Sequence, residues 1–196
     1  MYYFYPLIIR LLGISFCLVS LLFSSTAFAK QLATLETSKG NIVIELHEEL
    51  APNTVANFKQ YVESDFYNNT IFHRVIEGFM IQGGGFDQKF SRKKPKQAIK
   101  NEANKQLKNI IGSVAMARTN QPHSATSQFF INVNNNASLD FVNESPRGWG
   151  YAVFGQVIEG MDIVMGISQV KTGNKSRHQN VPVENIIILD AYLTQK

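Results

Sequence analysis

Short runs of alternating apolar and polar residues, separated by Gly and Asn, constrain the fold of this chain more than any other feature of its sequence. The runs are 33–37, 41–46, 71–76, 79–82, 112–117, 128–133, 152–157 and 185–190. A period of two places successive side chains on opposite faces of a strand, so each run predicts a strand with one buried face. Eight such strands predict a mainly β fold, either a closed antiparallel barrel or a sandwich.

Two other stretches predict helices. Apolar residues recur at helical spacing within 54–63, where Asn53 or Thr54 can cap the first free amides. The segment 162–168 has the same spacing and begins with Asp162. Because each helix has a single apolar stripe, we expect both helices to pack on the strands.

The first 29 residues differ from the rest of the chain. They contain one basic residue, Arg10, and no acidic residue. An apolar run over 11–23 is followed by the Ala-x-Ala sequence of 27–29, which is the order of a secretory signal with its cleavage site. The flank before Arg10 is apolar instead of basic, and the whole stretch is long enough to span a bilayer. We therefore expect 1–29 to be a signal peptide, with an uncleaved anchor as the alternative.

The composition of residues 30–196 excludes several kinds of chemistry. The only cysteine, Cys17, lies outside this range, so the range offers no disulfide, thiol nucleophile or thiolate metal site. The four histidines are scattered without the spacing of a zinc site. Without Arg10 this range has 18 Lys and Arg against 15 Asp and Glu, and a balance of +3 is too small to indicate a nucleic-acid partner. With no repeats and no linker, we expect one domain over 30–196 that uses no metal and no cofactor.

Motifs for phosphate binding and for serine hydrolysis are also missing. Gly83-Gly84-Gly85 lacks the residues that complete a phosphate-binding loop and indicates a bulge or a barrel corner. The basic segment Lys89–Lys100 is interpreted as a solvated loop, with a partner-binding loop as the alternative. Arg74 is unusual because it lies within an apolar strand, where it must pair with an acid, point outward or face a site.

Four motifs resemble those of the cyclophilin-type peptidyl-prolyl cis/trans isomerases. The run Phe-His-Arg-Val-Ile-Glu-Gly-Phe-Met-Ile-Gln-Gly-Gly over 72–84 resembles the family signature, and 116–118, 127–131 and 153–162 resemble the motifs that follow it. The resemblance is strongest to the bacterial periplasmic branch. It implies a closed eight-stranded antiparallel β-barrel capped by two α-helices, in a periplasmic protein.

The resemblance also implies which residues contact the substrate. Arg74 occupies the place of the catalytic arginine. The residues in the places of the proline pocket and the peptide groove are Phe79, Met80, Gln82, Ala117, Arg118, Gln128, Phe130, Leu139 and Tyr151. Rotation about an X–Pro bond passes a barrier of about 20 kcal/mol but makes and breaks no covalent bond. Such a reaction needs no nucleophile, acid–base pair or metal, so His73 is interpreted as a hydrogen-bonded strand residue.

Two residues depart from the family pattern. Ser138 stands where many cyclophilins have Trp and the bacterial branch often has Phe, so we expect weak cyclosporin binding. Tyr151 replaces the usual His, and Trp149 is interpreted as packing within its own loop. We expect a monomer that acts on proline-containing peptides and on exported proteins as they fold. The alternatives are a peptide-binding chaperone with little turnover and a surface-interaction protein that uses the segment Lys89–Lys100.

Overall fold

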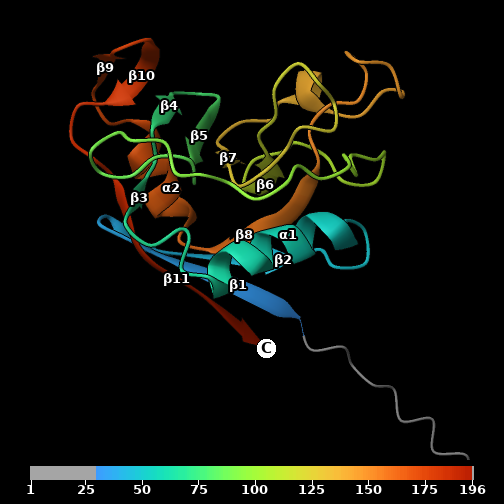
Figure 1. Ribbon diagram of the computed structural model, residues 1–196, viewed down its shortest axis with the longest axis horizontal. Helices are drawn as coiled ribbons and strands as arrows, with labels where there is room; N and C mark the ends of the chain where they lie inside the picture. Colours follow the sequence, from blue (N-terminus) through green and yellow to red (C-terminus); the bar gives the residue numbers. More distant parts are fainter. Residues whose placement is uncertain (1–29, 196) are drawn as a thin grey trace, which may run out of the picture.

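The computed structural model describes residues 30–195, so the predicted signal segment 1–29 lies outside the described residues. Two antiparallel sheets and two α-helices form the described part (Figure 1). The elements are β1 (Gln31–Thr37), β2 (Gly40–Leu46), α1 (Pro52–Glu63), β3 (Thr70–Ile71), β4 (Arg74–Ile76), β5 (Met80–Gly83), β6 (Ser113–Met116), β7 (Phe129–Asn132), a 3-10 helix η1 (Ala137–Leu139), β8 (Val153–Glu159), α2 (Met161–Ser168), β9 (Thr172–Lys175), β10 (His178–Pro182) and β11 (Ile187–Gln195).

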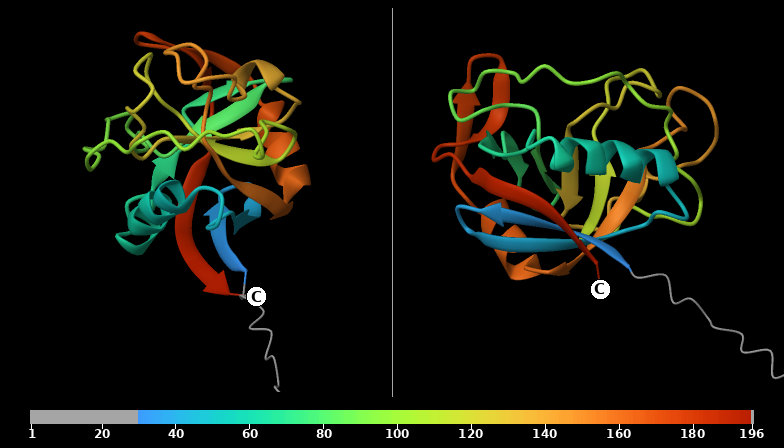
Figure 2. Two further views of the ribbon diagram at one scale, coloured as in Figure 1. Left: turned by 90° about the vertical axis from the view of Figure 1, so that its right-hand side faces the viewer. Right: turned by 60° about the horizontal axis from the view of Figure 1, so that its bottom comes forward.

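The main sheet has nine strands in the order β3-β11-β1-β2-β8-β6-β7-β5-β4. It curls strongly around α1, and Figure 2 shows the first and last strands, β1 and β11, side by side. The mainly β fold with two helices is therefore confirmed. Among residues 30–195, no helix is long and apolar enough to cross a membrane.

The predicted closed eight-stranded barrel is wrong, because the sheet is an open half-barrel. The predicted run 71–76 is divided into β3 and β4, which form opposite edges of the sheet. Between them, the Phe72 amide donates to the Ile186 carbonyl at 2.9 Å, and the His73 amide donates to the Gln82 carbonyl at 3.0 Å. These amides bond to different parts of the chain, so one continuous strand cannot form.

Strands β9 and β10 form a separate hairpin that the sequence did not predict. Their residues, Thr-Gly-Asn-Lys and His-Gln-Asn-Val-Pro, are mostly polar and do not alternate. The hairpin lies beside β4 at one end of the molecule (Figure 1). It therefore adds a wall next to the strand that holds Arg74.

The two faces of the sheet carry separate apolar clusters. Phe129 of β7 faces inward, where it lies against Phe58 of α1 with ring centroids 5.7 Å apart. Its neighbour Phe130 belongs to a small cluster on the outer face, together with Met80, Ala115 and Val153. Alternation along a strand produces this division, since adjacent side chains point to opposite faces. The inner cluster stabilises the fold, and the outer cluster is free to form a site.

Helix α1 begins with a cap from a distant residue. The Glu102 carboxylate accepts hydrogen bonds from the backbone amides of Asn53 at 3.1 Å and Thr54 at 2.7 Å, and from both of their side chains. The prediction that Asn53 or Thr54 caps the helix is therefore wrong, because both residues donate. Burial raises the pKa of Glu102, but the hydrogen bonds from Thr54 and Asn53 outweigh it, so the pKa lies below its usual value.

We expect Glu102→Gln to lower the free energy of unfolding by about 1 kcal/mol at neutral pH, as loss of a helix cap does. The folded-state pKa is depressed, so the contribution is present above the ordinary pKa and disappears as the pH falls through the folded value. Urea unfolding of both proteins at several pH values tests this. Glu144→Gln, an exposed glutamate, is the matched control. Equal stability of wild type and Glu102→Gln at neutral pH would contradict the capping role.

Candidate active site

The outer apolar cluster forms the floor of a cavity of about 230 Å³. The cavity is lined by Arg74, Phe79, Met80, Gln82, Ala117, Arg118, Phe130, Leu139 and Tyr151. The structure thus brings together all the predicted site residues except Gln128. The volume suits one small apolar group and is smaller than a pocket for a drug-sized ligand.

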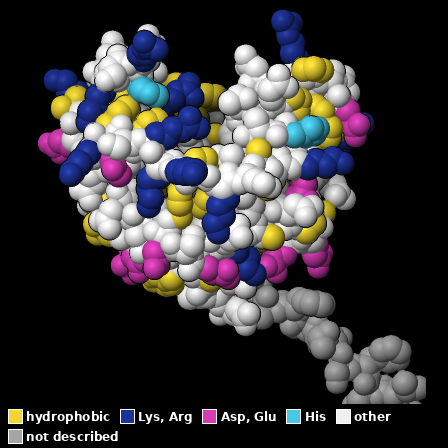
Figure 3. Space-filling view, in the orientation of Figure 1, with side chains coloured by type: hydrophobic (Ala, Val, Ile, Leu, Met, Phe, Trp, Pro, Cys, Tyr) yellow, Lys and Arg dark blue, Asp and Glu magenta, His cyan; other side chains and the backbone are white. Residues whose placement is uncertain are grey.

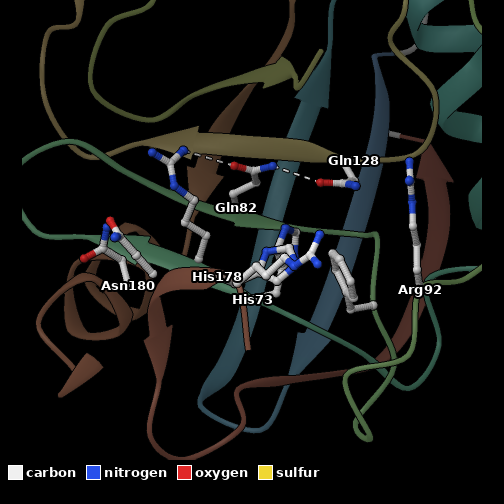
Figure 4. Close-up of a pocket in the computed structure, with 10 residues that line it drawn as sticks. His73, Gln82, Arg92, Gln128, His178 and Asn180 are labelled. Carbon is white, nitrogen blue, oxygen red and sulfur yellow. Dashed lines mark hydrogen bonds between the residues drawn. The ribbon is translucent and has the colours of Figure 1, made fainter. Parts of the chain in front are cut away.

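Arg74 lies at the edge of this cavity with most of its donors free. It pairs with Gln82 across β4 and β5, and its Nη1 donates to Gln82 Oε1 at 3.3 Å. Gln82 Nε2 in turn donates to Gln128 Oε1 at 2.9 Å (Figure 4). No ion pair within residues 30–195 includes Arg74. Of the alternatives left open by the sequence, Arg74 therefore faces a site, and its guanidinium retains N–H groups for a ligand.

The opposite wall of the cavity is held by Arg118 and Tyr151. Arg118 Nε donates to the Gly150 carbonyl at 2.8 Å, and its guanidinium lies 4.7 Å from the centre of the Tyr151 ring. The Tyr151 ring meets Phe130 edge-on, with centroids 5.6 Å apart. The Tyr151 amide donates to the Leu139 carbonyl at 2.9 Å. These contacts fix the wall before any ligand binds.

A comparison with family models identifies the chain. The model described as cyclophilin type peptidyl-prolyl cis-trans isomerase/CLD matches residues 32–193. The chain belongs to this family. Peptidyl-prolyl cis-trans isomerase B of Escherichia coli is 56% identical over 157 residues, which cover 80% of this chain and 96% of that protein. Peptidyl-prolyl cis-trans isomerase A of Dickeya dadantii is 48% identical over 190 residues, covering 95% of this chain and 98% of its own length.

A solved structure of the family supports the fold. A cyclophilin type isomerase of Cryptosporidium parvum, crystallised in the presence of the dipeptide Ala-Pro, superposes with a TM-score of 0.67 at 26% identity. The match covers 84% of this chain and 99% of the other. Together with the named relatives, it establishes the chain as an enzyme with peptidyl-prolyl cis-trans isomerase activity, which confirms the predicted reaction.

Sequence reasoning missed part of the cavity floor. Ala115 of β6 and Val153 of β8 pack with Met80 and Phe130 beneath it. Both side chains point to the outer face of the sheet, since their neighbours Val114 and Phe154 point inward and belong to the inner cluster. The alternation therefore contained the signal, but only once the inner and outer faces of the sheet were known.

Of the two departures from the family pattern, Tyr151 lines the cavity and Ser138 does not. Ser138 is exposed in η1, so it provides no wall, and weak cyclosporin binding stays a prediction. Trp149 is buried against Phe141 of its own loop, at 5.6 Å between ring centroids, but also against His123 of another loop, at 4.9 Å. Trp149 does not line the cavity and does not substitute for the residue missing at 138.

His73 is buried behind Arg74 and stays neutral. It is 4% exposed and lies between β3 and β4 instead of within a strand. Its amide donates to the Gln82 carbonyl, as the prediction of a hydrogen-bonded residue requires, but its Nδ1 has no hydrogen-bond partner among the described residues. Burial, together with the nearby positive charges of His178 and Arg74, lowers the pKa of His73 to about 4. The neutral imidazole, whose Nδ1 is buried, packs against the Phe86 ring with centroids 4.7 Å apart. Residues 30–195 also contain no group of three or more side chains suited to holding a metal ion.

The buried His73 predicts a loss of stability in mild acid. Its folded-state pKa is about 4 and its ordinary value is 6.5, so the unfolded chain binds more protons between these values. We expect the free energy of unfolding to fall by up to about 3 kcal/mol as the pH is lowered through this range. Urea unfolding of wild type and His73→Gln at a series of pH values measures it. Parallel curves for the two proteins would show that His73 is not responsible.

Proposed function

We propose that the chain isomerises X–Pro bonds at the Arg74 cavity, and that its substrates are exported proteins that fold in the periplasm. The observation that carries the site is the position of Arg74, whose guanidinium has free donors beside a small apolar cavity. The presence of Ala-Pro with the related Cryptosporidium protein supports a proline-containing ligand for this family. The assay is NMR exchange on a proline tetrapeptide, in which cis and trans forms give separate signals.

The geometry suggests how the reaction is accelerated. The prolyl ring fits against Phe79, Met80 and Phe130, which hold it while the preceding residue turns. In the twisted transition state the prolyl nitrogen loses amide resonance and gains a lone pair that can accept a hydrogen bond. Arg74 can donate to that nitrogen, an interaction that the planar ground state does not offer. The bond from Arg74 to Gln82 orients the guanidinium before the substrate arrives.

This mechanism separates the enzyme from a chaperone that uses the same groove. Binding alone would require apolar walls and backbone hydrogen bonds. Turnover also requires a hydrogen-bond donor for the prolyl nitrogen. Arg74 can supply it, because Gln82 holds its guanidinium at the cavity edge and it has no acidic partner within 30–195. A protein that binds the tetrapeptide but leaves its exchange rate unchanged would favour the chaperone.

The proposed location rests on the N-terminal sequence. Residues 1–29 have the order of a secretory signal, and the 48% identity to the Dickeya protein extends over 95% of the chain. We propose cleavage after Ala29 and membership of the periplasmic branch. Mass spectrometry of the protein from the periplasmic fraction tests both statements. A mature chain that begins at Met1 would contradict cleavage, and recovery only from the cytoplasm would contradict export.

A further inference from the structure

A second depression adjoins the cavity of about 230 Å³ that we propose binds proline, here called the proline cavity, and its lining is more strongly charged. Its volume is about 580 Å³, and it shares Arg74 and Gln82 with the smaller cavity. Gln128 lies here instead of in the proline cavity, which explains its absence from that lining. Figure 4 shows Arg92 and Asn180 on opposite sides of the depression, with Gln82 and Gln128 between them.

The lining of this depression is basic. It contains Arg74, Arg92 and Arg177 and no Asp or Glu. None of the three arginines takes part in an ion pair within the described part of the chain. Asp87 is close to Arg92 in sequence, but within residues 30–195 it does not pair with the arginines. Its carboxylate accepts hydrogen bonds from the backbone amides of Lys89 and Ser91 and stabilises the turn that these residues form. Figure 3 shows Lys and Arg side chains around the hollow, whereas Asp and Glu lie along the lower edge and the margins of this face.

The basic depression has a fixed framework. The His178 ring meets Phe86 and Phe90 edge-on, at 5.2 Å between centroids in both cases, and this contact docks the β9–β10 hairpin. Phe86 stacks on Phe90 at 4.9 Å and forms a β-bridge with Arg92. The backbone positions of Arg92 and Arg177 are therefore set by the same aromatic cluster, from two segments far apart in the sequence.

We infer that the basic depression binds an acidic side chain of the substrate, one to three residues from the proline, so that the enzyme prefers proline peptides with a nearby Asp or Glu. The inference rests on the proposed binding of proline at the Arg74 cavity. An extended chain advances about 3.3 Å per residue, so a neighbouring residue reaches an adjoining depression. Carboxylates match guanidinium groups in charge and in the geometry of their hydrogen bonds.

The test is a peptide series in which Glu or its isostere Gln occupies each of the three positions on either side of the proline. We expect one position at which Glu raises kcat/KM by about three- to fivefold over Gln at low salt, the size of a partly exposed charge pair. The ratio should fall toward one in about 0.5 M salt, since screening weakens exposed charges. The ratio compares two substrates on one protein preparation, so a partly unfolded sample does not alter it.

Variants assign the preference to the depression. The double substitution Arg92→Gln and Arg177→Gln should bring the Glu/Gln ratio close to one. Arg177→Glu should reduce it below one and create a preference for Lys at the same position. Arg147→Gln is the matched control, because Arg147 is an exposed arginine that lines neither cavity.

Three outcomes would overturn the inference. They are equal rates for Glu and Gln peptides at every position, a preference that persists in the double variant, and an equal loss in Arg147→Gln, which would indicate an effect of net charge. In each case wild-type turnover of the neutral peptide still tests the proposed function separately. Failure of that turnover would reject the proline site itself.

Discussion

Arg74→Ala is expected to lower kcat/KM for a neutral proline tetrapeptide by at least about tenfold, equivalent to roughly 1.4 kcal/mol of transition-state stabilisation. The guanidinium lies at the edge of the proline cavity, and only the bond from Nη1 to Gln82 occupies it within residues 30–195. In the proposed mechanism, the substitution keeps the apolar walls that hold the prolyl ring but removes the hydrogen-bond donor for the prolyl nitrogen. The fall should therefore appear mainly in kcat. NMR exchange measures it without a coupled protease.

Arg74→Lys is the matched variant for this experiment. It keeps the positive charge but loses the planar, multiply donating group, so we expect activity between those of wild type and Arg74→Ala. Thermal unfolding of all three proteins should give similar midpoints, because Arg74 is half-buried and forms no ion pair among the described residues. Undiminished activity of Arg74→Ala would refute the assigned role.

Gly150→Ala is expected to reduce both activity and stability, although Gly150 does not line the cavity. Its φ of 59° is in the left-handed region, and an added Cβ would lie 2.5 Å from the Leu139 carbonyl oxygen and 2.6 Å from that of Asp140. The backbone must move to relieve this overlap. Since the Gly150 carbonyl also accepts from Arg118, the movement would displace the cavity wall. We expect a loss of about 2–4 kcal/mol in the free energy of unfolding and a several-fold fall in kcat/KM.

Gly78→Ala separates steric overlap from backbone strain. Gly78 has a similar φ of 67°, but an added Cβ there would meet no atom within 4 Å. We expect Gly78→Ala to cost about 1 kcal/mol from conformation alone. Urea unfolding and the exchange assay on both variants compare the two effects. If Gly150→Ala costs no more than Gly78→Ala and retains full activity, the wall does not depend on Gly150.

The strands that alternate most clearly were predictable because each has one buried face. Segments 41–46 and 128–133 correspond closely to β2 and β7. The break between β3 and β4 was not predictable, since it depends on partners for Phe72 and His73 that only the folded chain provides. The hairpin β9–β10 was missed because its stability comes from the contacts of His178 with Phe86 and Phe90, more than eighty residues earlier in the chain.

The site shows the same division between local pattern and tertiary structure. From the residues alone, Arg74 had three interpretations, of which an outward-pointing side chain was the commonest, and only the family motifs favoured a catalytic place. The structure adds the bond to Gln82 and the cavity beside it. The distribution of Gln82 and Gln128 over two depressions could not be predicted, because it depends on the hairpin that forms the second wall.

Adjacent residues of β7 contribute to the core and to the site, so isomerase activity depends on the register with which β7 pairs. Phe129 is fully buried in the core, and Phe130 lies on the cavity floor. A slip of one residue between β7 and its neighbours would exchange these two rings and remove the proline cavity, even if the chain remained compact and rich in β structure. During refolding, recovery of isomerase turnover therefore reports correct alignment of β7, which circular dichroism and overall dimensions do not distinguish.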